Sequence, residues 1–130
     1  MIKAILWDHT KFETVELDPD SETPIFKQVN EMLECRTMTS IAFNSDLEAY
    51  VDDEGLLIEN PKYGAMWYKG DKLIQGVGGK ILFVNHDENG KTISITNDQR
   101  EMILGLDKKL LPNNNGTYQA LILNYYEEKG

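Results

Sequence analysis

The chain has few of the residues on which small proteins build disulfides, metal sites or acid–base catalysis. Its 130 residues include one cysteine, Cys35, and two histidines, His9 and His86. A lone cysteine forms no disulfide within the chain and supplies no Cys-based zinc site, which favours a reducing compartment. The two histidines are far apart in sequence, each in a predicted turn, and no nucleophile-plus-base motif is recognisable. We therefore expect a protein that is not an enzyme and that needs no cofactor.

Long hydrophobic runs are also missing. The opening stretch MIKAIL is too short for a signal peptide, and no segment approaches the roughly 20 apolar residues that span a bilayer. The chain contains no repeat, heptad pattern or low-complexity linker, and its 41% apolar and 27% charged residues are ordinary for a folded protein. We expect a single domain over residues 1–130 in the cytoplasm, with no membrane partner.

Basic residues are scarce and unevenly placed. Lys and Arg number 13 against 22 Asp and Glu, for a formal net charge of −9. Residues 1–60 hold 14 acids and four bases, whereas residues 61–130 hold eight acids and nine bases. Binding to duplex nucleic acid needs surplus Lys and Arg, so we expect no such partner. The first half is suited to a basic protein surface, and the second half can receive a small anion.

Hydrophobic periodicity predicts an α+β fold, with a mostly antiparallel sheet of hairpin-connected strands and two short helices. Thr23 and Pro24 are typical of a helix start, and the helix should end near Cys35. A second helix should follow Thr96, which with Gln99 matches a capping box. Strands are expected at 2–6, 12–17, 37–43, 47–51, 80–85, 91–96 and 117–126. Residues 55–68 indicate a short strand or helical turn followed by a loop, and residues 110–116 indicate a breaker and a turn.

Two acidic stretches resemble cation sites. Asp52-Asp53-Glu54 precedes Gly55 and then three apolar residues, which cannot serve as ligands for Ca²⁺. Asn85–Gly90 matches the start of an EF-hand loop, but Thr96 stands where the bidentate glutamate is needed. Turns explain both stretches better, because Asp, Asn and Gly favour them. We expect no metal site in either stretch.

The segment 62–72, KYGAMWYKGDK, interleaves aromatic and basic residues. Aromatic rings can stack on a nucleobase while lysines meet its phosphate. The alternative is that Trp67 and one tyrosine belong to the core and the lysines to the surface. Residues 76–80, GVGGK, lack the spacing of a phosphate-binding loop, although a lysine beside flexible backbone could still meet an anion. The candidate ligand-binding residues are Lys62, Tyr63, Trp67, Tyr68, Lys69, Lys72 and Lys80.

Four segments together resemble the DUF3846 family of unknown function. They are MIKAIL, FETVEL, AYVDDEGLL and GGKILFVNHDENGKT, of which YVDDEGLL is the most specific. The resemblance covers about residues 1–95, and the tail from residue 97 has no counterpart. It implies an origin in phages, plasmids or the bacteria that carry them, and therefore a host bacterial cytoplasm. It implies no established activity and transfers no catalytic residue.

Proteins of that origin often blunt host defence, which leaves two binding functions open. The first is sequestration of a small anionic nucleotide signal by the aromatic–lysine segment. The second is docking of the acidic first half, through Asp52, Asp53 and Glu54, on a basic host defence protein, in the manner of a DNA mimic. A housekeeping role and homo-oligomer formation also remain open.

Overall fold

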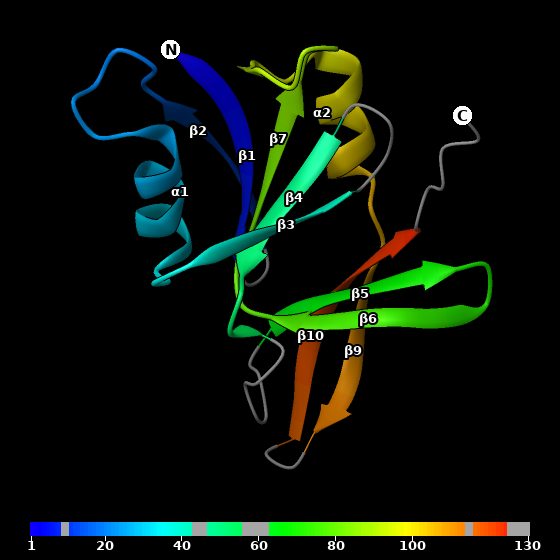
Figure 1. The fold of residues 1–130 in the computed structure, drawn as a ribbon. Helices are drawn as coiled ribbons and strands as arrows, with labels where there is room; N and C mark the ends of the chain where they lie inside the picture. Colours follow the sequence, from blue (N-terminus) through cyan, green and yellow to red (C-terminus); the bar gives the residue numbers. More distant parts are fainter. Residues whose placement is uncertain (9–10, 43–46, 56–62, 114–115, 125–130) are drawn as a thin grey trace.

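The computed structural model describes residues 1–8, 11–42, 47–55, 63–113 and 116–124. This part of the chain has the α+β fold that the sequence predicts, with ten strands in two mostly antiparallel sheets and two short helices (Figure 1). The helices are α1 (Ile25–Leu33) and α2 (Asn97–Leu104).

Sheet A combines strands that are joined by hairpins with strands that are far apart in the sequence. All of its neighbouring strands are antiparallel. Its order is β2-β1-β7-β4-β3, and β8 pairs with the far end of β7. Its strands are β1 (Ile2–Asp8), β2 (Lys11–Leu17), β3 (Met38–Ala42), β4 (Leu47–Asp52), β7 (Ile81–His86) and β8 (Thr92–Ile93).

Sheet B lies below sheet A in Figure 1 and has the order β6-β5-β10-β9. Its strands are β5 (Tyr63–Lys69), β6 (Lys72–Gly78), β9 (Lys108–Asn113) and β10 (Gly116–Asn124). The β5–β10 pair is parallel, whereas the other pairs in this sheet are antiparallel.

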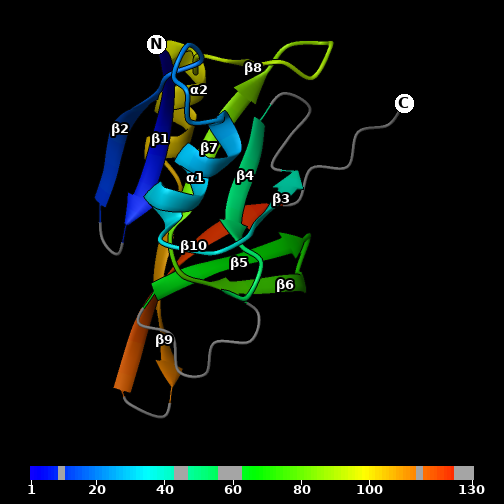
Figure 2. The same cartoon turned by 60° about the vertical axis from the view of Figure 1, so that its left-hand side comes forward.

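The central strands of sheet A are buried on both faces, and this explains their apolar runs. On β7, Ile81 and Phe83 enter one core, and Leu82 and Val84 enter the other. Side chains alternate between faces along a strand, so a strand covered on both sides must be apolar throughout. Figure 2 shows the two covers, with α1 in front of sheet A and α2 behind it.

Helix α1 covers one face of sheet A with the apolar stripe predicted from the sequence. Val29 and Leu33 are buried there, and Ile25 and Met32 pack beside them. The predicted Thr23 N-cap is wrong, because Pro24 occupies the cap position and no side chain caps the helix. The Gln28 side chain instead donates to the backbone oxygens of Thr23 and Asp18, each at 2.8 Å, and so ties the preceding loop to the helix.

The other core lies between sheet A, sheet B and α2. Sheet B contributes Ala65, Trp67, Val77, Leu121 and Leu123 to it, and α2 contributes Ile103. The capping box of α2 is confirmed, since the Thr96 hydroxyl accepts the N–H of Gln99 at 3.1 Å and the Gln99 carboxamide accepts the N–H of Thr96 at 2.9 Å.

Three sequence predictions differ from the fold. Residues 63–69 and 72–78 form a hairpin, whereas the sequence predicts a short strand or helical turn followed by a loop over residues 55–68. Residues 108–113 form the edge strand β9 where a breaker was expected, because an edge strand tolerates Pro112. The predicted strand 91–96 is reduced to Thr92–Ile93, because Thr96 already caps α2.

Candidate functional site

The aromatic–lysine segment lies on β5 and the start of β6, and its two central aromatic residues have opposite environments. Trp67 is 0% exposed and belongs to the core between the sheets, so it cannot stack on a ligand. The prediction that Trp67 binds a ligand is therefore wrong. Tyr68 follows it on the strand and is half-buried, with its hydroxyl 3.9 Å from the sulfur of Met66.

Tyr68 lines an open hollow on sheet B together with Gly70, Asp71, Lys109 and Ile122. Its volume is about 300 Å³. The hollow brings the β5–β6 turn next to β9 and β10, since β10 lies between β5 and β9 in the sheet. Lys109 is exposed and was missed from the sequence, because nothing local relates it to residues forty positions earlier.

The remaining predicted lysines and Tyr63 have different outcomes. Lys72 is exposed at the start of β6, beside the turn that lines the hollow. Lys80 is 16% exposed, and its ammonium lies 3.2 Å from Glu34 and 3.8 Å from Asp8. Lys80 thus has two carboxylates beside its ammonium, and it is not among the residues that line the hollow. Lys62 lies outside the described residues, as do the side chains of Tyr63 and Lys69.

The acidic stretch Asp52-Asp53-Glu54 forms a turn that its own residues and neighbours satisfy. The Asp52 carboxylate accepts the N–H of Glu54 at 2.9 Å, and the backbone N–H of Asp53 donates to the oxygen of Thr37 at 2.9 Å. Glu54 pairs with Arg36, and this hydrogen bond and charge raise the pKa of Arg36. The turn prediction is confirmed, while docking of this turn on a basic protein stays a prediction.

Gly55, at the end of the same turn, is required by close packing. A Cβ at this position would lie 2.6 Å from the backbone oxygen of Gly78 and 2.9 Å from a methyl group of Val77. The segment YVDDEG therefore leaves sheet A at β4 and brings its glycine against β6 of sheet B. The turn at the end of this segment therefore joins the two sheets.

In the stretch Asn85–Gly90, the first two residues end β7 and the rest form the β7–β8 hairpin turn, as predicted. The Asp87 carboxylate accepts the N–H groups of Asn89 and Lys91, each at 2.9 Å, and Gly90 has a φ of 81°. The turn's own backbone thus engages the carboxylate that a cation would need. In the described part of the chain, no three His, Cys, Asp or Glu side chains gather as a metal site would require.

His86 lies in a strand and not in the turn that the sequence predicts for it. It is the last residue of β7, and its side chain is 13% exposed. Its Nε2 lies 3.3 Å from the hydroxyl of Tyr50, and its Nδ1 lies 3.8 Å from the Glu48 carboxylate. Burial, and then the charge of Glu48, raise the pKa of Tyr50. A tyrosine held protonated in this way is a poor nucleophile.

Comparison with known families gives a match over most of the chain. The model of the family described as "Domain of unknown function (DUF3846)" matches residues 2–107. The match extends past the segments that carry the sequence resemblance and includes α2, but it ends before β9. No curated protein and no solved structure matches the chain. Neither described helix has the length and apolar character to cross a membrane.

Proposed function

The chain belongs to the DUF3846 family, and for this member we propose a non-enzymatic binding function, the capture of a small anionic nucleotide in the sheet B hollow. The observation that carries the proposal is the hollow itself, in which Tyr68 and Lys109 line one volume of about 300 Å³. An aromatic face and a lysine are the two groups that nucleotide capture needs, because the base stacks and the phosphate is neutralised. This volume is at the lower limit of the range that is usual for small-molecule binding sites.

The charges of the hollow restrict the nucleotide. Lys109 and Asp71 both line it, so their formal charges cancel. Exposed Lys72 beside the turn adds one positive charge near its edge. A triphosphate with several negative charges would meet too few cations, whereas a cyclic nucleotide carries one negative charge for each phosphodiester. The proposed ligand is therefore a cyclic or otherwise weakly charged nucleotide.

The proposed biological role follows from the ligand class. A phage-type accessory protein that binds a nucleotide without converting it would lower the free concentration of that signal in the host cytoplasm. Such sequestration needs no catalytic residue, in keeping with a candidate site of one aromatic residue and two lysines. Counter-defence is the role that we propose for it.

The test is a thermal-shift screen of cyclic and linear nucleotides, followed by calorimetry on each hit. A ligand that binds the folded state alone must raise the melting temperature by mass action. Tyr68→Leu keeps an apolar side chain but removes the stacking ring, and it should weaken binding about tenfold or more. Lys109→Gln should weaken binding and reduce its dependence on salt, since Lys109 meets charge.

Lys27→Gln is the matched control, because Lys27 is an exposed lysine on α1, at the opposite face of sheet A from sheet B. It should bind like the unmodified protein. The proposal fails if no nucleotide raises the melting temperature, or if Tyr68→Leu folds and binds every hit with unchanged affinity.

A further inference from the structure

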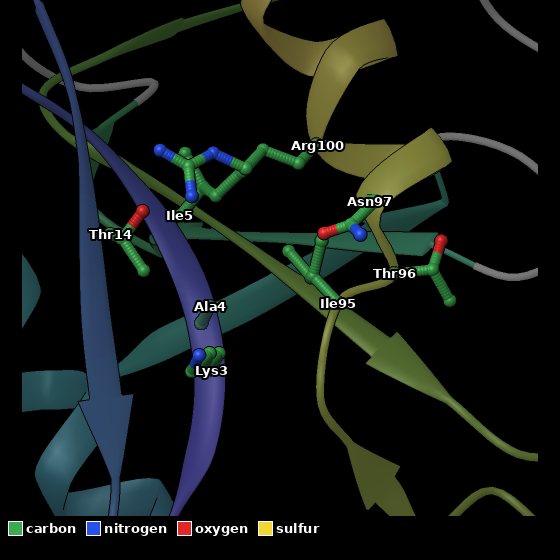
Figure 3. Close-up of a pocket in the computed structure, with 8 residues that line it drawn as sticks. All are labelled: Lys3, Ala4, Ile5, Thr14, Ile95, Thr96, Asn97 and Arg100. Carbon is green, nitrogen blue, oxygen red and sulfur yellow. The ribbon is translucent and has the colours of Figure 1, made fainter.

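A second, smaller pocket lies between sheet A and the start of α2 (Figure 3). Arg100 extends from α2 across Ile5 towards the hydroxyl of Thr14 on β2, and Lys3 stands further along β1. Asn97 forms the α2 side. The eight lining residues are Lys3, Ala4, Ile5, Thr14, Ile95, Thr96, Asn97 and Arg100.

The lining is cationic although the protein is acidic. It contains Lys3 and Arg100 and, among the described residues that form it, no Asp or Glu, in a chain with 22 acids and 13 bases. Both cationic side chains are exposed, and no ion pair of either is found with the described acids. One acidic neighbour is Glu16, which pairs in register with Lys3 across β1 and β2. Two positively charged side chains thus line the same small hollow.

The backbone of Lys3 holds one wall of the pocket in place. Its N–H donates to the Ser94 hydroxyl at 3.0 Å, and its carbonyl oxygen accepts the N–H of Ile95 at 3.0 Å. These two bonds attach the segment before α2 directly to β1, although the residues are more than ninety positions apart. The pocket is therefore a product of the fold and not of one flexible loop.

A buried amide holds the other wall. Asn85 is 4% exposed, and its side chain donates to the Ser94 oxygen at 3.0 Å and accepts from the Gln99 side chain at 3.1 Å. Gln99 in turn completes the capping box with Thr96. This network fixes the first turn of α2, and with it the base of Arg100. Rigid support of this kind lowers the entropy cost of binding.

We propose that this pocket binds the phosphoryl group of a small phosphate monoester. A volume of about 60 Å³ holds roughly five waters, which is the size of one tetrahedral oxyanion and too small for a base and sugar. A phosphate monoester carries close to two negative charges near neutral pH and offers three acceptor oxygens. Lys3 and Arg100 match the charges, and Asn97 and Thr14 supply further polar groups. The guanidinium of Arg100 suits two oxygens of one phosphate at once.

This inference stands apart from nucleotide capture, because the pocket shares no lining residue with the sheet B hollow. It also does not rest on the end of α2 alone, since its two charges come from side chains on different elements. The rest of the ester would extend into solvent from the open side of the pocket.

The test is a titration of ¹⁵N-labelled protein with inorganic phosphate and with phenyl phosphate, followed by NMR at constant ionic strength. Saturable shifts are expected at the amides of Ile95, Thr96 and Asn97 and at the Arg100 side-chain N–H. Arg100→Gln and Lys3→Gln should each weaken phosphate binding about tenfold or more. Glu16→Gln should strengthen it about two- to fivefold, because it removes a negative charge that lies in register with Lys3 on the neighbouring strand.

Lys27→Gln and Tyr68→Leu serve as controls, and both should bind phosphate as the unmodified protein does. Acetate is the control ligand, because a singly charged planar carboxylate should bind much more weakly. The proposal is overturned if phosphate produces no saturable shift at these positions, or if Arg100→Gln binds phosphate with unchanged affinity. Equal affinity for acetate would overturn the assignment to a phosphoryl group.

Discussion

The two sheets differ in how their strands find one another. In sheet A, β1 pairs with β2 and β3 with β4 through short connections, and β7 joins the two hairpins. In sheet B, the parallel β5–β10 pair joins hairpins about fifty residues apart. To form this parallel pair, the chain must close a long loop before the two strands make contact. Closing a long loop costs entropy and slows folding, so the pair depends on stabilisation by packing. Sheet B is therefore the part that relies most on its core residues.

The two candidate sites also differ in how much of each lies within the family match. The family match ends at residue 107, before β9 and β10. All residues of the α2 pocket lie within the match, whereas Lys109 and Ile122 of the sheet B hollow lie outside it. The pocket proposed to bind a phosphoryl group is thus lined entirely by the part of the chain that carries the family likeness. The hollow exists in full only with the C-terminal hairpin.

Replacing Trp67 should have the largest effect, because it fills the core between the sheets. Trp67→Ala should lower the free energy of unfolding by about 3–5 kcal/mol, the usual cost of deleting a buried aromatic side chain. Urea unfolding followed by circular dichroism is the measurement. Trp67→Phe should cost much less, because the indole N–H is buried without a hydrogen-bond partner among the described residues. Equal losses in both variants would contradict this account of the core around Trp67.

A pair of glycines on adjacent strands gives the next largest effect and tests the close packing of sheet B. A Cβ at Gly64 would lie 2.2 Å from the backbone oxygen of Val77, whereas a Cβ at Gly76 meets nothing nearer than 4.0 Å. Gly64→Ala should therefore destabilise the protein by about 1–3 kcal/mol or more. Gly76→Ala should be neutral or stabilise it by up to about 1 kcal/mol, since Ala loses less chain entropy. The measurement is the melting temperature of each variant. A lower melting temperature for Gly76→Ala than for Gly64→Ala would contradict the close packing at Gly64.

The same glycines explain why sheet A could be predicted from the sequence and sheet B in large part could not. The alternation and apolar runs of β1, β4 and β7 predicted strands near their true bounds. Gly64, Gly76 and Pro112 are typical of loops, so β5, β6 and β9 were missed. Their presence in strands depends on a close approach to Val77 and on an edge position, which are properties of the assembled fold.

The candidate sites were predictable only in part for a related reason. Tyr68 and Lys72 are accessible, as the ligand-binding role predicted for them requires, but Trp67 was grouped with them because the strand was not recognised. Once residues 63–69 are a strand, alternation places Trp67 and Tyr68 on opposite faces. Lys3, Arg100 and Lys109 carry no local signal, since each gains its role from residues that only the fold brings near.

A smaller effect should follow from removing the cap of α2, which belongs to the side of sheet A that builds the phosphoryl pocket. Thr96→Ala removes the hydroxyl that accepts the Gln99 N–H and should cost about 1 kcal/mol of stability. Thr96→Ser keeps the hydroxyl and should cost little. Thermal unfolding of both variants is the measurement. If Thr96→Ala melts with the unmodified protein, the capping box contributes nothing to holding α2 against sheet A.

The smallest effect concerns Cys35, which reports on the turn that joins the sheets. Burial raises the pKa of its thiol, and the charges of Asp52 and Glu54 raise it further. Because the thiolate is the reactive form, alkylation at pH 8 should be slower than for a free cysteine in a peptide. Asp52→Asn removes one of the two charges, so it should lower the pKa of the Cys35 thiol and speed alkylation by a few-fold at most.

Asp53→Asn is the matched control for the Cys35 prediction, since Asp53 is not among the groups that shift this pKa, and it should leave the alkylation rate unchanged. The rate measured with iodoacetamide against pH separates a pKa change from simple exposure, because exposure would raise the rate of the thiolate itself at every pH. If Asp52→Asn and Asp53→Asn react alike across that pH range, the turn after β4 does not hold Asp52 beside Cys35.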